Sequence, residues 1–151
     1  MPAERPRGIL ARSLAKAPAR MTTDEIQIAA RRPVIAVVDD DPAVCNSLKF
    51  SLEMEGFSVM VFYSGAEFGA VSDLGDCACL VIDQTLPDTS GMQLIETLRA
   101  RHIDIPAILI VGHPHARLAA QAAAAGIPVV EKPLFGNALS AKIRELCNIP
   151  D

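Results

Sequence analysis

Aromatic residues and long apolar runs are scarce in this sequence. There is no tryptophan and only one tyrosine, and aromatic residues make up 4% of the 151 positions. No stretch approaches the roughly 18 consecutive apolar residues of a membrane-spanning helix. Half of the residues are nevertheless hydrophobic, which is typical of a compact α/β domain and unlike a disordered or fibrous chain. We therefore expect a cytoplasmic protein with one hydrophobic core and no membrane contact.

The cysteines lack the spacing of a zinc site. Cys45, Cys77, Cys79 and Cys147 form no C-x₂-C pair, and no secretory signal indicates an oxidising compartment. Cys77 and Cys79 occupy alternate positions of an expected strand, so their side chains should point to opposite faces of a sheet. We expect most of the four to be small buried hydrophobic residues.

The sequence also lacks an excess of positive charge. The formal net charge is −4, and residues 1–32 contribute +4 from seven basic and three acidic side chains. The remaining residues therefore carry −8. Because phosphate contacts dominate affinity for nucleic acids, an acidic body is a poor partner for them. We expect no direct binding of nucleic acid.

Residues 1–32 differ in composition from the rest of the chain. They contain scattered arginines and prolines and show weak hydrophobic periodicity. This composition predicts a flexible basic N-terminal extension, with Met21 as an alternative initiator. A basic arm or a targeting peptide is the other interpretation. The predicted folded domain comprises residues 33–151.

Short apolar runs alternate with amphipathic segments five times in the predicted domain. The expected strands are 34–38, 57–62, 78–82, 106–111 and 128–130, and the expected helices cover about 42–55, 64–73, 91–101, 115–125 and 138–147. Runs that are apolar at every position are typical of parallel strands buried on both faces. The pattern predicts an α/β fold of (βα)₅ type with a doubly wound, five-stranded parallel sheet.

Charged residues follow three of the expected strands. Asp39 and Asp40 follow the first strand, Asp83 the third and Lys132 the fifth. Open α/β sheets bind their ligands at this carboxyl edge. Clustered carboxylates repel one another, so we expect a hard divalent cation, Mg²⁺, among them, with Lys132 as a second positive charge. Asp41 is expected only to cap the following helix.

The chain from about residue 33 to residue 151 resembles a receiver domain of two-component response regulators. Three motifs carry the resemblance in order: V-V-D-D-D-P-A-V, I-D-Q-T-L-P-D-T-S-G and E-K-P-L. It implies a flavodoxin-like receiver fold and a cis peptide bond between Lys132 and Pro133. It also implies a regulatory protein that is phosphorylated on an aspartate and is not an enzyme beyond its own phosphorylation and dephosphorylation.

The same resemblance assigns roles to individual residues. It makes Asp83 the phosphoacceptor and Lys132 the partner of the phosphoryl oxygens. Mg²⁺ would be bound by Asp39, Asp40 and Asp83, with the backbone carbonyl of Thr85 as a further ligand. Little covalent chemistry is then asked of the protein beyond positioning and charge stabilisation.

The resemblance also implies partners. A sensor histidine kinase or a histidine phosphotransfer protein would donate the phosphoryl group from phosphohistidine. Since no output domain follows the predicted domain, we expect a single-domain regulator that signals by contact with a downstream protein. Pairing of two copies through the fourth helix, fifth strand and fifth helix is a further option.

Two positions depart from the family pattern. Val111 stands where the family has Thr or Ser, and Val129 stands where it has an aromatic switch residue. Valine has no hydroxyl to hydrogen-bond a phosphoryl oxygen. We expect an atypical switch, or alternatively a pseudo-receiver that binds partners without phosphorylation. His113 and His115 lie in the loop after the fourth strand, where one of them could act on the phosphoryl group.

A third interpretation starts from Asp39-x-Asp41, which resembles the opening of aspartate-nucleophile phosphatases. Those enzymes usually continue with glycine, whereas this chain continues with Pro42 and Ala43. They also need a later acidic metal motif, and no acidic cluster follows Glu131. The phosphatase is therefore the weakest of the three interpretations.

Overall fold

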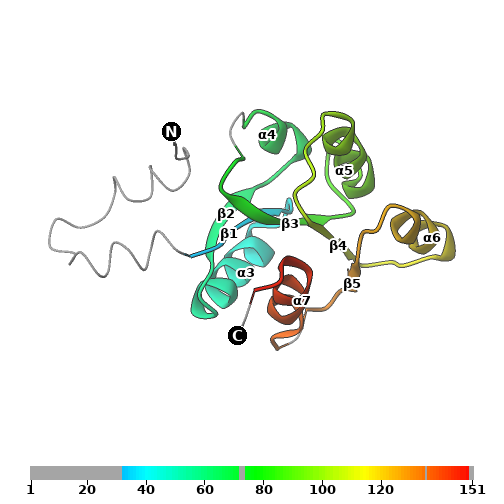
Figure 1. The fold of residues 1–151 in the computed structure, drawn as a ribbon. Coiled ribbons are helices and arrows are strands. Elements are labelled where there is room, and N and C mark those ends of the chain that lie inside the picture. The colour runs from blue at the N-terminus through cyan, green and yellow to red at the C-terminus, as the bar shows by residue number, and fades with distance from the viewer. Residues whose placement is uncertain (1–31, 72–73, 135, 150–151) are drawn as a thin grey trace, which may run out of the picture.

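The computed structural model describes residues 32–71, 74–134 and 136–149. The predicted basic extension, residues 1–32, lies outside this part of the chain except for its last residue. Strands and helices alternate along the described residues (Figure 1). In chain order they are β1 (Val34–Val38), α3 (Pro42–Met54), β2 (Ser58–Phe62), α4 (Gly65–Gly69), β3 (Cys77–Asp83), α5 (Gly91–Ala100), β4 (Ala107–Val111), α6 (Ala116–Ala124), β5 (Val129–Glu131) and α7 (Ala138–Cys147).

The strands form one parallel sheet in the order β2-β1-β3-β4-β5. Helices α4, α5 and α6 pack on one face, and α3 and α7 pack on the other (Figure 1). The predicted doubly wound (βα)₅ fold is thus confirmed. In this strand order the chain direction across the sheet reverses between β1 and β3, which is where flavodoxin-like folds bind ligands.

Burial on both faces explains the apolar strands. Every residue of β1 and β4 is buried. Cys77 belongs to the core on the α4–α6 side and Cys79 to the core on the α3–α7 side, as the alternation predicts. Cys45 is also buried and Cys147 is half-buried. Burial raises the pKa of Cys77 to about 11, which makes its thiol inert at neutral pH.

Helix α4 is shorter than predicted. It ends at Gly69, whereas the sequence predicted an end near residue 73, which lies outside the described residues. Glycines occupy both ends of this five-residue helix, and glycine loses more backbone entropy in a helix than other residues. The capping box that Ser64 and Glu67 could form at the start of α4 is present only in part. Ser64 Oγ accepts from the Glu67 amide, but the Glu67 carboxylate accepts from the Tyr63 amide.

The other helix ends agree with their sequence signals. Asp41 caps α3 by accepting a hydrogen bond from the Ala43 amide, 2.9 Å away. Gly56 follows α3 with a φ of 100°, a left-handed conformation that favours glycine after a helix. Helix α7 has its predicted bounds, and the peptide bond between Lys132 and Pro133 is cis, as implied.

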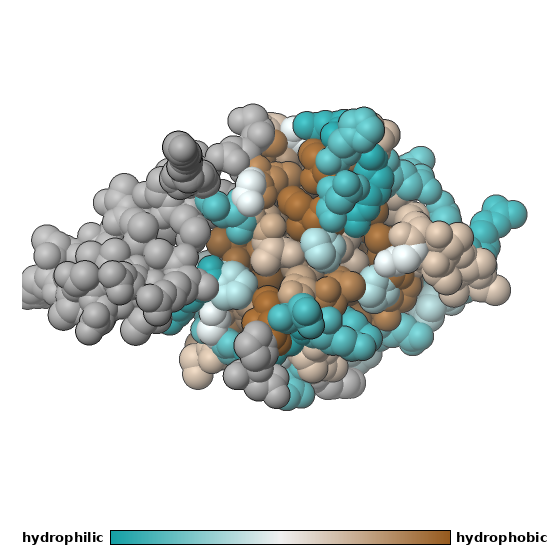
Figure 2. Space-filling model, in the orientation of Figure 1, coloured by the Kyte–Doolittle hydropathy of each residue, from teal (hydrophilic) through white to brown (hydrophobic). Residues whose placement is uncertain are grey.

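Apolar side chains show along the middle of the visible face in Figure 2, with polar side chains over α5. Among the described residues, no helix is both long and apolar enough to cross a membrane.

Candidate functional site

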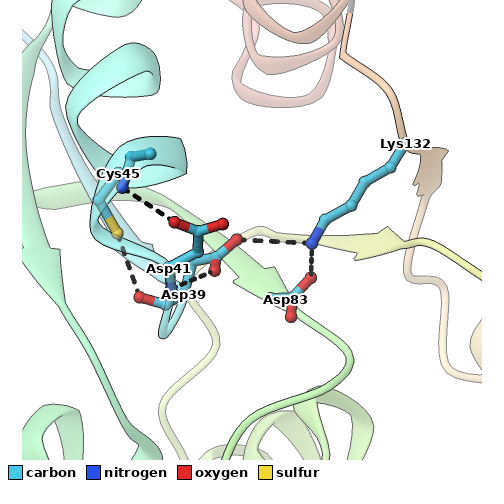
Figure 3. A network of polar contacts seen from close by, with 6 residues as sticks. Asp39, Asp41, Cys45, Asp83 and Lys132 are labelled. Carbon is cyan, nitrogen blue, oxygen red and sulfur yellow. Dashed lines mark hydrogen bonds and ion pairs between the residues drawn. The ribbon is translucent and has the colours of Figure 1, made fainter.

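The predicted site residues converge at the carboxyl edge of the sheet (Figure 3). Asp39 follows β1, Asp83 is the last residue of β3, and Lys132 follows β5. Carboxylate oxygens of Asp39, Asp40 and Asp83 lie within 4.8 Å of one another. The sheet therefore brings together four residues from three distant segments of the sequence, at the reversal point between β1 and β3.

Lys132 is the cation of this cluster. Its Nζ lies 2.8 Å from Asp83 Oδ1 and 3.8 Å from Asp39 Oδ2. The lysine side chain is 33% exposed, while those of Asp83 and Asp39 are 5% and 4% exposed. Burial opposes the charge on Lys132, but the hydrogen bond with Asp83 and the negative charges of the three carboxylates together outweigh it, so the pKa of Lys132 is raised. The lysine thus stays protonated at neutral pH.

The positive charge of one lysine does not fully compensate the negative charges of the three carboxylates. Burial raises the pKa of Asp39, and the nearby charge of Asp83 raises it further, against the Asp41 amide and Lys132. A raised carboxyl pKa means that the ionised form is under-stabilised where it stands. Two buried carboxylates and the exposed Asp40 form an oxygen-only donor set, which suits a hard divalent cation.

Backbone contacts fix the position of Asp39. The Asp41 amide donates to Asp39 Oδ1 at 2.9 Å, and the Asp39 amide donates to the Phe62 carbonyl at 3.0 Å. The buried Cys45 thiol donates to the Asp39 carbonyl at 3.1 Å (Figure 3). Since its carboxylate already caps α3, Asp41 is used as a helix cap, which argues against the general acid/base role of a phosphatase.

The turn after Asp83 is held by contacts that the sequence did not reveal. The Gln84 amide donates to the Ile110 carbonyl, and the Gln84 side chain accepts from the Met92 amide at 3.0 Å. A Cβ on Gly91 would lie only 2.6 Å from the Asp83 carbonyl oxygen. Only glycine allows α5 to begin this close to β3. The sequence signalled Gly91 as a helix start but gave no sign of this close approach.

Thr85 lies just beyond this turn and pairs with Ser90 in an isolated antiparallel bridge. The bridge closes the base of the loop between β3 and α5. Its position next to Asp83 is compatible with the predicted ligand role of the Thr85 carbonyl, and that role stays a prediction.

The match to a known family decides the classification. A family model described as the response regulator receiver domain matches residues 35–144. The chain belongs to the response regulator receiver domain family. Receiver domains serve two-component systems as regulatory phosphoacceptors and typically bind Mg²⁺ at an acidic pocket.

Curated relatives agree with this classification. The transcriptional regulatory protein FixJ of Rhizobium meliloti is 38% identical over 100 residues, which are 66% of this chain and 49% of FixJ. The C4-dicarboxylate transport transcriptional regulatory protein DctR of Rhodobacter capsulatus is 35% identical over 106 residues, which are 68% of this chain and 54% of DctR. The chain thus spans about half the length of the curated relatives it matches.

Solved receiver structures share the fold. A CheY-like receiver domain protein from Methanospirillum hungatei superposes with a TM-score of 0.71 at 27% identity, covering 78% of this chain and 94% of that one. The crystal structure of FixJ-N superposes with a TM-score of 0.64 at 33% identity and the same coverages.

The two positions that depart from the receiver pattern differ in exposure. Val111 is 2% exposed at the end of β4, and its carbonyl accepts from the Lys132 amide at 2.9 Å. Val129 is 36% exposed at the start of β5. Neither side chain has a polar group, so neither can hydrogen-bond to a ligand at the carboxylate cluster.

The two histidines after β4 have different surroundings. His115 caps α6, because its Nδ1 accepts from the Leu118 amide at 3.3 Å. This hydrogen bond gives His115 a structural role. His113 is exposed, and its predicted action on a phosphoryl group stays a prediction.

Proposed function

We propose that this receiver domain accepts a phosphoryl group on Asp83 from a phosphohistidine of a sensor histidine kinase or a phosphotransfer protein. The observation that carries the proposal is the placement of Lys132 Nζ, 2.8 Å from Asp83 Oδ1, beside a cluster of three carboxylates. A nucleophilic carboxylate next to a fixed cation suits phosphoryl transfer, which depends mainly on positioning and charge stabilisation.

In the proposed reaction an Asp83 carboxylate oxygen forms a bond to phosphorus while the phosphorus–nitrogen bond of phosphohistidine breaks. The imidazole leaves with the electron pair of that bond. The Lys132 ammonium, which pairs with Asp83 in the free domain, offsets the charge of the transferred phosphoryl oxygens. The product is an acyl phosphate, which is reactive, so the modification is transient.

The carboxylate cluster supports the dependence on Mg²⁺. Asp39, Asp40 and Asp83 would hold the ion with the carbonyl of Thr85, since their oxygens already lie within 4.8 Å of one another. Bound there, Mg²⁺ supplies further positive charge for the phosphoryl oxygens.

The switch is proposed to be atypical. Val111 has no hydroxyl that could hydrogen-bond a phosphoryl oxygen, and Val129 has no aromatic ring that could change its position on phosphorylation. We therefore expect Asp83 phosphorylation to couple weakly, or by another route, to the surface formed by α6, β5 and α7. Signalling by contact with a protein partner, and pairing of two copies through this surface, remain parts of the proposal.

Mass analysis of the intact protein tests the central reaction. The wild type, incubated with acetyl phosphate and Mg²⁺, should gain a labile phosphoryl adduct that Asp83→Asn lacks. Asp104→Asn, at an exposed aspartate remote from the cluster in sequence, should behave as the wild type. The second candidate, a phosphorylation-independent binding module, is favoured by Val111 and Val129 and would leave all three proteins unmodified.

A further inference from the structure

A carboxylate outside the acidic cluster joins the loop after β3 to α4. Asp88 Oδ1 accepts from the Gly65 amide at 3.0 Å, and Asp88 Oδ2 accepts from the Ala66 amide at 2.7 Å. These amides belong to the first turn of α4, where backbone donors have no partner within the helix. One side chain thus satisfies two donors that lie more than 20 residues away in the sequence.

The fit between the loop and α4 is close. Gly65 is buried, and a Cβ there would lie 2.6 Å from Thr89 Cγ2 and 3.4 Å from each Asp88 carboxylate oxygen. Any side chain at position 65 would therefore require the Thr89 side chain, or the loop that carries it, to move. The hydrogen bond from the Gly65 amide, with that from Ala66, also lowers the pKa of Asp88, so its carboxylate is ionised at neutral pH.

This loop carries the proposed metal ligand Thr85. The loop is tied at its base by the pairing of Thr85 with Ser90 and by the contacts of Gln84 with β4 and α5. Asp88 ties its far part to α4. Further along the loop, Leu86 is buried in the core on the α4–α6 side, and Asp88 holds the part of the loop that lies against α4.

We propose that Asp88 is a positioning residue for the divalent cation. By holding the loop against α4, it keeps the carbonyl of Thr85 in the place where it can ligate the ion together with Asp40 and Asp83. The inference rests on the proposed function, because it requires that the carboxylate cluster binds Mg²⁺. Binding and loop position are then thermodynamically linked, so the ion should in turn stabilise the hydrogen bonds at the start of α4.

A Mg²⁺ titration followed by the backbone amide resonances tests the inference on the full chain. Asp88→Ala should weaken Mg²⁺ binding by about tenfold, which is the lower end of the effect of residues that orient metal ligands. Asp88→Asn keeps one acceptor oxygen, so its Mg²⁺ affinity should lie between those of Asp88→Ala and the wild type. Asp104→Ala removes an exposed aspartate outside the loop, and should leave the Mg²⁺ affinity close to that of the wild type because salt screens distant exposed charges.

A charge-neutral variant separates geometry from electrostatics. Gly65→Ala leaves all charges in place but crowds the Thr89 side chain of the loop, and should also weaken Mg²⁺ binding. In the wild type, Mg²⁺ should slow hydrogen exchange at the Gly65 and Ala66 amides, and this slowing should be absent in Asp88→Ala. Circular dichroism and thermal unfolding of each variant establish that the domain is folded.

The outcomes distinguish the inference from the proposed function. If Asp88→Ala and Gly65→Ala bind Mg²⁺ as tightly as the wild type does, the positioning role is wrong and the proposed function stands. If the wild type itself binds no Mg²⁺, the proposed metal site fails, and the inference fails with it. If Asp88→Ala does not fold, Asp88→Asn and Gly65→Ala decide by the same titration.

Discussion

Lys132 Nζ and Asp83 Oδ1 lie 2.8 Å apart, the lysine reaching from the end of β5 and the aspartate from the end of β3. The two strands are not neighbours, because β4 lies between them. The ion pair therefore bridges the carboxyl edge of the sheet and places a fixed cation beside the proposed phosphoacceptor.

Removing the lysine should destabilise the domain. Lys132→Ala leaves Asp83 and Asp39 without this cation, and both carboxylates are buried. We expect the free energy of unfolding in urea to fall by about 1–2 kcal/mol, less than for a fully buried pair because Lys132 is partly exposed. The matched control is Lys142→Ala, which removes an exposed pair with Glu145 and should change the free energy of unfolding by at most about 0.5 kcal/mol. Equal losses in both variants would contradict a special role for Lys132.

The raised pKa of Asp39 predicts a pH dependence of stability. Because burial raises the folded-state pKa of Asp39 above its ordinary value of 3.8, Asp39 favours folding below that value and loses this contribution as pH rises through its folded pKa. At neutral pH without Mg²⁺, Asp39→Asn should therefore be more stable than the wild type. This advantage should shrink as pH falls through the folded-state pKa of Asp39 toward its ordinary pKa. Urea unfolding at a series of pH values measures the difference, and an advantage that grows on acidification would contradict the prediction.

Gly91 should tolerate no side chain. In Gly91→Ala the new Cβ would lie 2.6 Å from the Asp83 carbonyl oxygen and 2.8 Å from Leu109 Cδ1. Since the carbonyl is backbone of a central strand, we expect a loss of about 1–3 kcal/mol in the free energy of unfolding. Gly69→Ala is the control, because a Cβ there has no neighbour within 4 Å, and it should be neutral or slightly stabilising. A neutral Gly91→Ala would show that α5 can move away from β3.

The fold could be predicted from the sequence in those segments whose hydrophobic pattern matches their burial in the structure. The apolar runs of β1, β3 and β4 indicated buried parallel strands. The charged residues at the ends of β1, β3 and β5 marked Asp39, Asp83 and Lys132 as neighbours at one edge of the sheet. The predicted α4 was too long, because the helical pattern beyond Gly69 was followed although glycine favours an earlier end.

The contacts that loop residues make with the helices could not be predicted from the local sequence. The Gln84 side chain accepts from the first turn of α5, and Asp88 accepts from α4 across more than 20 residues. In the sequence both look like ordinary polar loop residues. Likewise, nothing in the sequence indicated that His115 caps α6. Such roles depend on how helices approach the sheet edge, which periodicity does not specify.

Restoring a hydroxyl should test the atypical switch. Val111→Thr places a hydroxyl at a buried position and should reduce the free energy of unfolding by about 1–2 kcal/mol. With beryllofluoride and Mg²⁺, it should show larger amide shifts over α6, β5 and α7 than the wild type, because the hydroxyl can bond the phosphoryl analogue. Val130→Thr serves as the control, because it places the same side chain on the neighbouring strand β5, opposite Ile110. Large shifts over the same surface in the wild type would refute weak coupling.

The position of the phosphoryl group tests the central claim most directly. After incubation with acetyl phosphate and Mg²⁺, borohydride reduces an acyl phosphate at aspartate to homoserine, and peptide mass analysis then locates the changed residue. We predict homoserine at position 83 in the wild type and at no aspartate in Asp83→Asn. Conversion at Asp39 or Asp40 in place of Asp83, or no conversion in the wild type, would contradict the assignment of Asp83 as the phosphoacceptor.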